Sequence, residues 1–217
     1  MSGRVPESNT GNAPRTAHDL RSAAVEALEA IAARRSISRL SAPAPGEADL
    51  EAILRAATCA PDHGTLRPWR FMVLEGEAKD AFGPVLAAAT VAEYRDRGRE
   101  PEPAKVEKDL HKMDRAPLMV AVVCAYQPSE KIPRDEQFGA VVAAVQNACL
   151  AATALGFGSM WRTGPNATTP HVKAALGIDA DDAIVAFLYL GTIEDDKAKG
   201  PNEGDLDGVV THWSPPA

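Results

Sequence analysis

Leu118-Met119-Val120-Ala121-Val122-Val123-Cys124 is the stretch of this sequence that decides its fold. It follows Pro117 and contains no polar residue. An apolar run without alternation is typical of a strand buried on both faces, because a half-exposed strand would alternate apolar and polar side chains. We therefore expect a central strand here, in a sheet that other elements cover on both sides.

Three other segments are expected to join this strand in the core. Residues 134–155 are almost all Ala, Val, Leu and small polar residues on every side, which predicts a core helix that also reaches a subunit interface. The run from Ala183 to Leu190 predicts a second buried strand, and the bulky residues from Trp69 to Leu74 suit a third. Val209 to Trp213 is expected to add an edge strand.

Helical patterns occur before, between and after these strands. They cover residues 19–33, a segment from Glu47 that stops before Pro61, residues 77–97, a charged stretch at 105–113 that is expected to face water, and residues 170–176. This order is not a regular βαβ alternation. It predicts an α+β fold, a three-layer sandwich with a sheet of mixed direction.

Length and composition bound the class of protein. The 217 residues, with 45% hydrophobic and 24% charged residues, predict one globular domain at 18–217 after a disordered tail at 1–17. A net charge of -7 argues against nucleic acid as a partner. With neither a secretory signal nor a membrane span predicted, we expect a cytoplasmic protein.

Several kinds of site lack their defining residues. The three cysteines form no CxxC pair and are expected to be small buried hydrophobes, and the five histidines show no metal-ligand spacing, so no metal is expected. Rossmann, P-loop and zincin motifs are missing. A GxSxG elbow is also missing, so hydrolase chemistry is unsupported.

Arg34-Arg35-Ser36-Ile37-Ser38-Arg39 is the segment best suited to an anion. It offers three guanidinium groups and two hydroxyls directly after a helix, and such groups bind phosphate oxygens. The alternative is a solvated helix end, where arginine complements the helix dipole. On local grounds this alternative is the commoner one, and both stay open.

Four segments in this order resemble the nitroreductase family. They are Arg34 to Arg39, Ala60 to Val73, Ala154 to Gly164 and Phe187 to Thr192. Four ordered blocks are far more specific than any one of them. The similarity is greatest to the short NAD(P)H nitroreductase branch, and it implies a homodimeric α/β/α sandwich whose mixed central sheet is mainly antiparallel, with FMN bound at each of two subunit interfaces.

The resemblance also implies the site residues. Arg34, Arg35 and Ser36 would hold the FMN phosphate and ribityl chain, and the other cofactor-binding residues would be Cys59, His63 from the partner subunit, Trp161, Arg162 and Thr163. No catalytic side chain is expected, since the flavin carries the chemistry. We hypothesise that Arg162 is the cation beside the pyrimidine edge of the flavin.

One departure from the family leaves the flavin-ring contacts open. Larger members carry Asn-x-Gln-Pro-Trp where this chain has Thr65-Leu66-Arg67-Pro68-Trp69. Either His63 and Arg67 replace the missing amide side chains, or backbone groups hold the ring.

The implied activity is hydride transfer from NADH or NADPH through FMN to a nitroaromatic or quinone-like acceptor. One alternative is flavin-dependent dehalogenation or flavin fragmentation, which would depend on a lid, and the only comparable insert is Tyr94 to Met113. Another is a non-catalytic flavin-binding dimer. A third is a protein without flavin, in which Arg34 to Arg39 is a solvated turn.

Overall fold

A four-stranded sheet forms the centre of the fold in a computed structural model that describes residues 27–194 and 200–216. Its strands are β1 (Trp69–Glu75), β2 (Leu118–Cys124), β3 (Gly158–Arg162) and β4 (Ala183–Gly191), in the order β1-β2-β4-β3. Each strand runs antiparallel to its neighbours, with Val120 of β2 opposite Val73 on one side and Leu188 on the other. All seven residues of β2 are buried, which confirms the predicted central strand.

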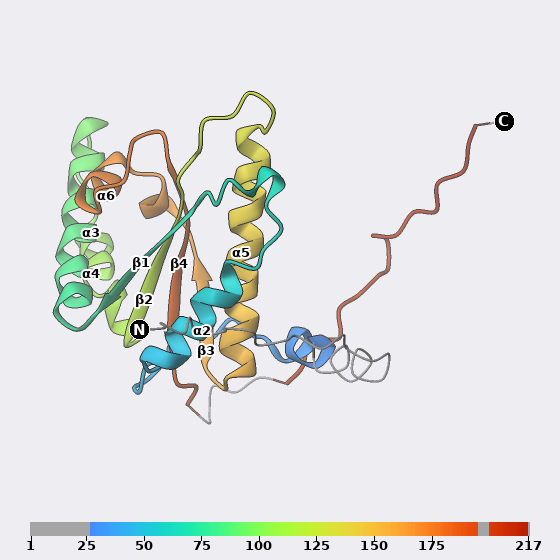
Figure 1. The fold of residues 1–217 in the computed structure, drawn as a ribbon. Helices are drawn as coiled ribbons and strands as arrows, with labels where there is room; N and C mark the ends of the chain where they lie inside the picture. The colour runs from blue at the N-terminus through green and yellow to red at the C-terminus, as the bar shows by residue number, and fades with distance from the viewer. Residues whose placement is uncertain (1–26, 195–199, 217) are drawn as a thin grey trace, which may run out of the picture.

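Helices cover both faces of this sheet (Figure 1). One face carries α3 (Gly76–Asp96), α4 (Pro103–Leu110) and α6 (Pro170–Ala175), and the other carries α2 (Glu47–Ala57) and α5 (Arg134–Ala154). Alternate residues of β2 enter two separate cores, Met119 and Ala121 on the α3 side and Val120 and Val122 on the α5 side. The predicted α/β/α sandwich is confirmed, and β2 is apolar throughout because each of its faces lies in a core.

The N-terminal segment of the described chain adds a parallel pairing at the β3 edge. Residues 27–33 are helical, and the chain then forms an isolated parallel bridge between Ser36 and Ser159. Ser41 bridges Thr192 in the antiparallel direction. The sheet is therefore mainly antiparallel, as expected. Most of the expected tail at 1–17, and the start of the expected helix at 19–33, lie outside the described residues.

Helix α5 contradicts the expectation that no segment is long and apolar enough to cross a membrane. By length and composition this helix alone qualifies among the described residues, and 44% of its most apolar window is buried inside the fold. Its buried residues, such as Val141 and Val145, pack against the sheet and α2. Packing in the core therefore accounts for the apolar residues on this face of α5.

One strand was missed, and one predicted strand is wrong. Strand β3 was not expected, because its five residues show no clear pattern and it becomes a strand only by pairing with β4. Val209 to Trp213, the expected edge strand, forms no strand and is exposed. These residues belong to the C-terminal arm, residues 200–216, which extends away from the sheet past α5 in Figure 1.

Candidate functional site

Arg34, Arg35 and Ser36 leave the helix at 27–33 and run beside β3. The Ile37 N–H donates to the Ser159 carbonyl at 3.1 Å, which fixes the segment at this edge of the sheet. The Arg35 Nη1 donates to the Ala32 and Arg34 carbonyls, each at 3.0 Å. Arg35 thus caps the helix end, and its Nε and Nη2 make no hydrogen bond within the described chain.

Arg34 lies on the α5 side of the sheet edge. Burial raises the pKa of the Cys149 thiol in α5, and the neighbouring Ser159 and the positive charge of Arg34 oppose part of that rise. Arg34 forms no ion pair with a carboxylate in the described ranges. Its charge is therefore available to an anion at this edge.

Strand β3 joins this segment to the second predicted block. Met160 packs on the α3 side, whereas Trp161 packs on the α5 side and its indole N–H donates to the Val185 carbonyl at 3.1 Å. Trp161 can therefore offer a ligand only its ring. Burial raises the pKa of Tyr189 to about 12, and the charges of Arg162 and Arg115 oppose that rise. Arg162 thus lies on the α3 side, close to the core.

A cavity of about 690 Å³ lies where β3 ends, bounded by α4, the 3-10 helix η2 (Lys112–Arg115) and the 3-10 helix η3 (Pro165–Ala167). All three predicted residues of the second block, Trp161, Arg162 and Thr163, line it. Its other lining residues are Leu86, Glu102, Ala104, Lys105, Lys108, Asp109, Lys112, Arg115, Met160, Gly164, Pro165, Asn166 and Phe187.

Asp109 anchors α4 beneath this cavity. It is only 1% exposed, which contradicts the expectation that its charged segment faces water throughout. Thr90 of α3 donates to its carboxylate at 2.5 Å, Lys105 does so at 3.1 Å, and Lys112 forms a second ion pair. Burial alone would raise the pKa of Asp109, but the hydrogen bonds from Lys112, Thr90 and Lys105 together lower it.

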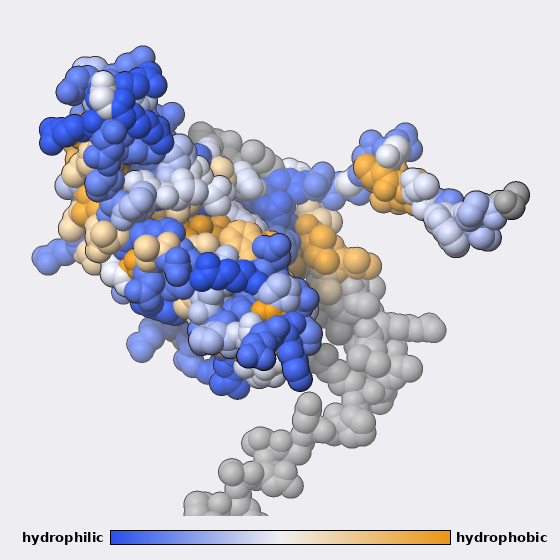
Figure 2. Space-filling view, turned by 90° about the horizontal axis from the view of Figure 1, so that it is seen from above, coloured by the Kyte–Doolittle hydropathy of each residue, from blue (hydrophilic) through white to orange (hydrophobic). Residues whose placement is uncertain are grey.

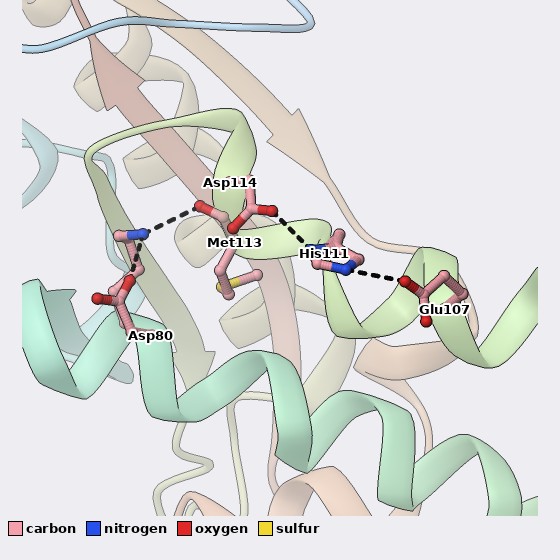
Figure 3. A network of polar contacts seen from close by, with 6 residues as sticks. Asp80, Glu107, His111, Met113 and Asp114 are labelled. Atoms are coloured by element: carbon pink, nitrogen blue, oxygen red, sulfur yellow. Dashed lines mark hydrogen bonds and ion pairs between the residues drawn. The ribbon is translucent and has the colours of Figure 1, made fainter.

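A polar network holds the corner between α4 and η2 against α3 (Figure 3). The His111 ring lies between two carboxylates, with Asp114 2.8 Å from Nδ1 and Glu107 3.0 Å from Nε2. The hydrogen bond to Asp114, and to a smaller extent the one to Glu107, raises the pKa of His111. Lys79 of α3 donates to the Met113 carbonyl at 3.3 Å. This wall of the cavity is therefore tied to the rest of the fold.

Two buried donors that line the cavity have no acceptor. The Arg162 Nε and the Asn166 Nδ2 form no hydrogen bond within residues 27–194 and 200–216. A buried donor without a partner costs about 1–3 kcal/mol. A ligand with acceptor oxygens would remove that cost, and FMN, with its phosphate and ring carbonyls, fits this donor set.

His63 lies far from the Arg34 segment within one chain. It is exposed in the 3-10 helix η1 (His63–Thr65), and its Nδ1 is 2.7 Å from Glu136 near the start of α5. The charge of Arg34 acts on Cys149, which lies thirteen residues beyond Glu136 in α5, about 20 Å at 1.5 Å per residue. One chain therefore does not bring His63 and Arg34 to the same point.

Cys59 also stays apart from the cavity. It lies just beyond the end of α2 and is exposed, so the expectation that it is a buried hydrophobe is wrong. No other element of the described chain packs over the thiol at the end of α2, so it stays exposed. Cys124 and Cys149 are buried, as predicted. All three thiols are free.

The sequence interpretation missed the cationic wall of the cavity and Asn166. Lys105, Lys108 and Lys112 were treated as a solvated charged face, and Arg115 was not considered. The close spacing of these lysines was a usable signal, but nothing local indicated that α4 would close over β3.

The family model described as Nitroreductase family matches residues 31–192. The Escherichia coli K12 protein named "Putative NAD(P)H nitroreductase YdjA" is 39% identical over 189 residues, which cover 87% of this chain and all of that protein.

Solved structures agree with the fold. A Bacillus cereus "Nitroreductase-like Family Protein" superposes with a TM-score of 0.71 at 24% identity, covering 87% of this chain and 96% of the other. A Desulfovibrio desulfuricans "putative nitroreductase in complex with fmn" superposes with a TM-score of 0.65 at 24% identity, covering 88% and 98%.

Proposed function

Because the chain belongs to the nitroreductase family, we propose that it is an FMN-dependent oxidoreductase that passes hydride from NADH or NADPH to an electron-poor small molecule. The acceptor class is a nitroaromatic or quinone-like compound. The observation that carries this proposal is the bridge between Ser36 and Ser159, which joins the Arg34 segment to the strand that leads into the cavity. This bridge pairs two predicted cofactor segments that are 123 residues apart in the sequence.

Each predicted residue has a defined task in this proposal. Arg34, Arg35 and Ser36 bind the FMN phosphate through charge-assisted hydrogen bonds at the sheet edge. Arg162 supplies a positive charge and an unpartnered donor. Trp161, whose N–H is already bonded, supplies an apolar wall. FMN, when bound, supplies the hydride chemistry, so these side chains need only bind, orient and exclude water.

The cofactor site is completed by a second copy of the chain. In an antiparallel pairing of two α5 helices, the His63 end of one copy would lie beside the Arg34 end of the other. That would remove the separation of about 20 Å seen within one chain. Exposed apolar residues support such a pairing: Phe138 on α5 is 37% exposed and Leu155 at its end is 43% exposed.

The C-terminal arm supports the same assembly. Its residues 200–216 are all exposed, and they include Leu206, Val209, Val210 and Trp213. The arm begins against the N-terminal helix, where the Asn202 N–H donates to the Ala32 carbonyl at 2.9 Å. Figure 2 shows hydrophobic residues on the projecting arm, away from the body of the protein. Apolar residues held away from their own core favour contact with a partner.

The cytoplasm is the proposed place of action. Thiols stay reduced there, which fits the three free cysteines.

The visible spectrum of the purified protein tests the cofactor and the class together. We expect bound FMN, bleached under anaerobic conditions by NADH, by NADPH or by both, and reoxidised by a nitroaromatic or a quinone. A protein that is colourless and cannot be reconstituted with FMN would refute the proposal. A flavoprotein that stays oxidised with both nicotinamides would instead be a flavin-binding dimer without reductase activity.

A further inference from the structure

His63 and Glu136 form a pair at the start of α5, outside the cavity at the end of β3. The His63 Nδ1 lies 2.7 Å from a carboxylate oxygen of Glu136. An ionised carboxylate can only accept hydrogen bonds, so Nδ1 carries the proton between the two groups. In the neutral ring this leaves Nε2 as an acceptor, and within the described chain Nε2 has no hydrogen-bond partner.

The loop that carries His63 is held on both sides of this residue. The Arg67 N–H donates to the Asp62 carboxylate at 2.7 Å, which closes the loop around His63. Gly64 lies so close to Ile132 that a Cβ added there would be 2.4 Å from the Ile132 Cδ1. Arg67 has a φ of 50°, a left-handed conformation that a residue with a side chain keeps only where its surroundings impose it.

Gln137, the neighbour of Glu136, fixes the segment against which this loop packs. It is only 3% exposed, and its Nε2 donates to the Gln127 carbonyl at 3.0 Å and to the Ile132 carbonyl at 3.4 Å. The first turn of α5 therefore positions the His63 loop and Glu136 together. The side chains of the pair are nevertheless 65% and 50% exposed. An exposed ion pair adds only about 0–1 kcal/mol to stability, so stability alone does not account for this positioning.

We propose that Glu136 is a positioning residue of the cofactor site: it fixes His63 so that Nε2 accepts a hydrogen bond from the FMN held by the second copy of the chain. The inference rests on the proposed function, in which His63 reaches the cofactor of the partner. The donors of oxidised FMN are the ring N3–H and the hydroxyls of its ribityl phosphate chain. Nε2 is matched to one of them only while Nδ1 keeps the proton. Glu136 acts through His63 alone.

Glu136→Ala removes the carboxylate, and Asp135→Ala is its matched control. Both residues are acidic, exposed and in the first turn of α5, so the loss of the helix-dipole interaction is the same for both. Asp135 forms no ion pair within residues 27–194 and 200–216. The flavin is removed from each full-length protein, which is then titrated with FMN. We expect Glu136→Ala to weaken FMN binding about fivefold and Asp135→Ala to leave it unchanged.

A double-mutant cycle separates positioning from a general structural role. His63→Gln should weaken FMN binding at least as much as Glu136→Ala does. In the His63→Gln protein, Glu136→Ala should then cause no further loss, whereas a loosened α5 would weaken binding in both backgrounds.

Nitrogen NMR of protein labelled at histidine reads the tautomer directly. The His63 signals are those missing from His63→Gln. We expect them to show the proton on Nδ1 in the unmodified protein, and to lose this preference in Glu136→Ala.

Four results would overturn the inference. They are unchanged FMN binding in Glu136→Ala, the same loss in Asp135→Ala, the same loss in the His63→Gln background, or a His63 ring whose proton lies on Nε2 in the unmodified protein. Each of them leaves the proposed function standing if the protein binds FMN and a nicotinamide reduces it. The proposed function itself fails if the unmodified protein binds no FMN or is reduced by neither nicotinamide.

Discussion

Gly83→Ala tests how tightly α4 is held against α3. A Cβ added to Gly83 would lie 2.2 Å from the Leu110 carbonyl oxygen at the end of α4. A relaxed carbon–oxygen contact is roughly 3.3 Å, so the two helices must separate by about 1 Å. The obstacle is backbone, and no side-chain rotation can relieve it. Such a shift would strain the Thr90 and Lys79 hydrogen bonds that hold this corner.

The expected loss of stability follows from two opposed contributions. Overpacking of this kind costs about 3 kcal/mol, the upper end of its usual range, because the clash is with a carbonyl. Replacing glycine by alanine in a helix returns about 1 kcal/mol. We therefore expect a net loss of about 2 kcal/mol, which lowers Tm by about 4–8 °C in a chain of this size.

Calorimetry and urea unfolding of the two proteins measure this loss. Ala81→Gly, an exposed change in the same helix, measures the helix-propensity contribution by itself and should cost about 1 kcal/mol. A Tm for Gly83→Ala equal to or above that of the unmodified protein would refute the reasoning. It would mean that α4 moves freely, and that the cavity wall is not fixed by its approach to α3.

Three other predictions concern charge and assembly. Asp114 and Glu107 raise the pKa of His111 in the folded protein, so the stability that protonated His111 adds is complete below the ordinary histidine pKa and is lost as pH rises through the folded pKa. Urea unfolding should therefore show less stability at pH 8 than at pH 6, and His111→Gln should reduce that difference. Arg34→Ala should weaken FMN binding about tenfold in a flavin-fluorescence titration, whereas an unchanged Kd would exclude Arg34 from the phosphate site. Trp213→Ala, at a side chain that is 80% exposed, should shift a dimer towards monomer in sedimentation experiments, and an unchanged equilibrium would show that the arm makes no intersubunit contact.

Local sequence patterns were sufficient for the interior of the fold. The apolar runs of β2 and β4 and the apolar helix α5 were predicted within one or two residues, since each pattern reflects burial on every side. The ends of the sheet were not predictable in this way. Strand β3 has only five residues of mixed character and depends on β4 for its hydrogen bonds. Val209 to Trp213 has strand-forming residues but no neighbouring strand with which to pair.

The candidate site divides along the same line. The Arg34 segment and the Trp161 block were identified from the sequence, through their likeness to a family whose model matches residues 31–192. Their joining through Ser36 and Ser159 was not predictable, and neither was the closure of α4 over the end of β3. The same lysines that look like a solvated helix face in the sequence therefore line a cavity in the fold.

By itself, the sequence determined the most apolar buried helix and strands and the family that the chain resembles, because burial and helical periodicity act between residues close in the chain. The tertiary structure alone decided which distant residues meet. It paired Ser36 with Ser159, buried Asp109 beneath its lysines, and left a buried donor of Asn166 and one of Arg162 without an acceptor in the described chain. The physical reason is that hydrogen bonds and charge pairs between distant segments depend on how the layers pack, and no local pattern records that packing.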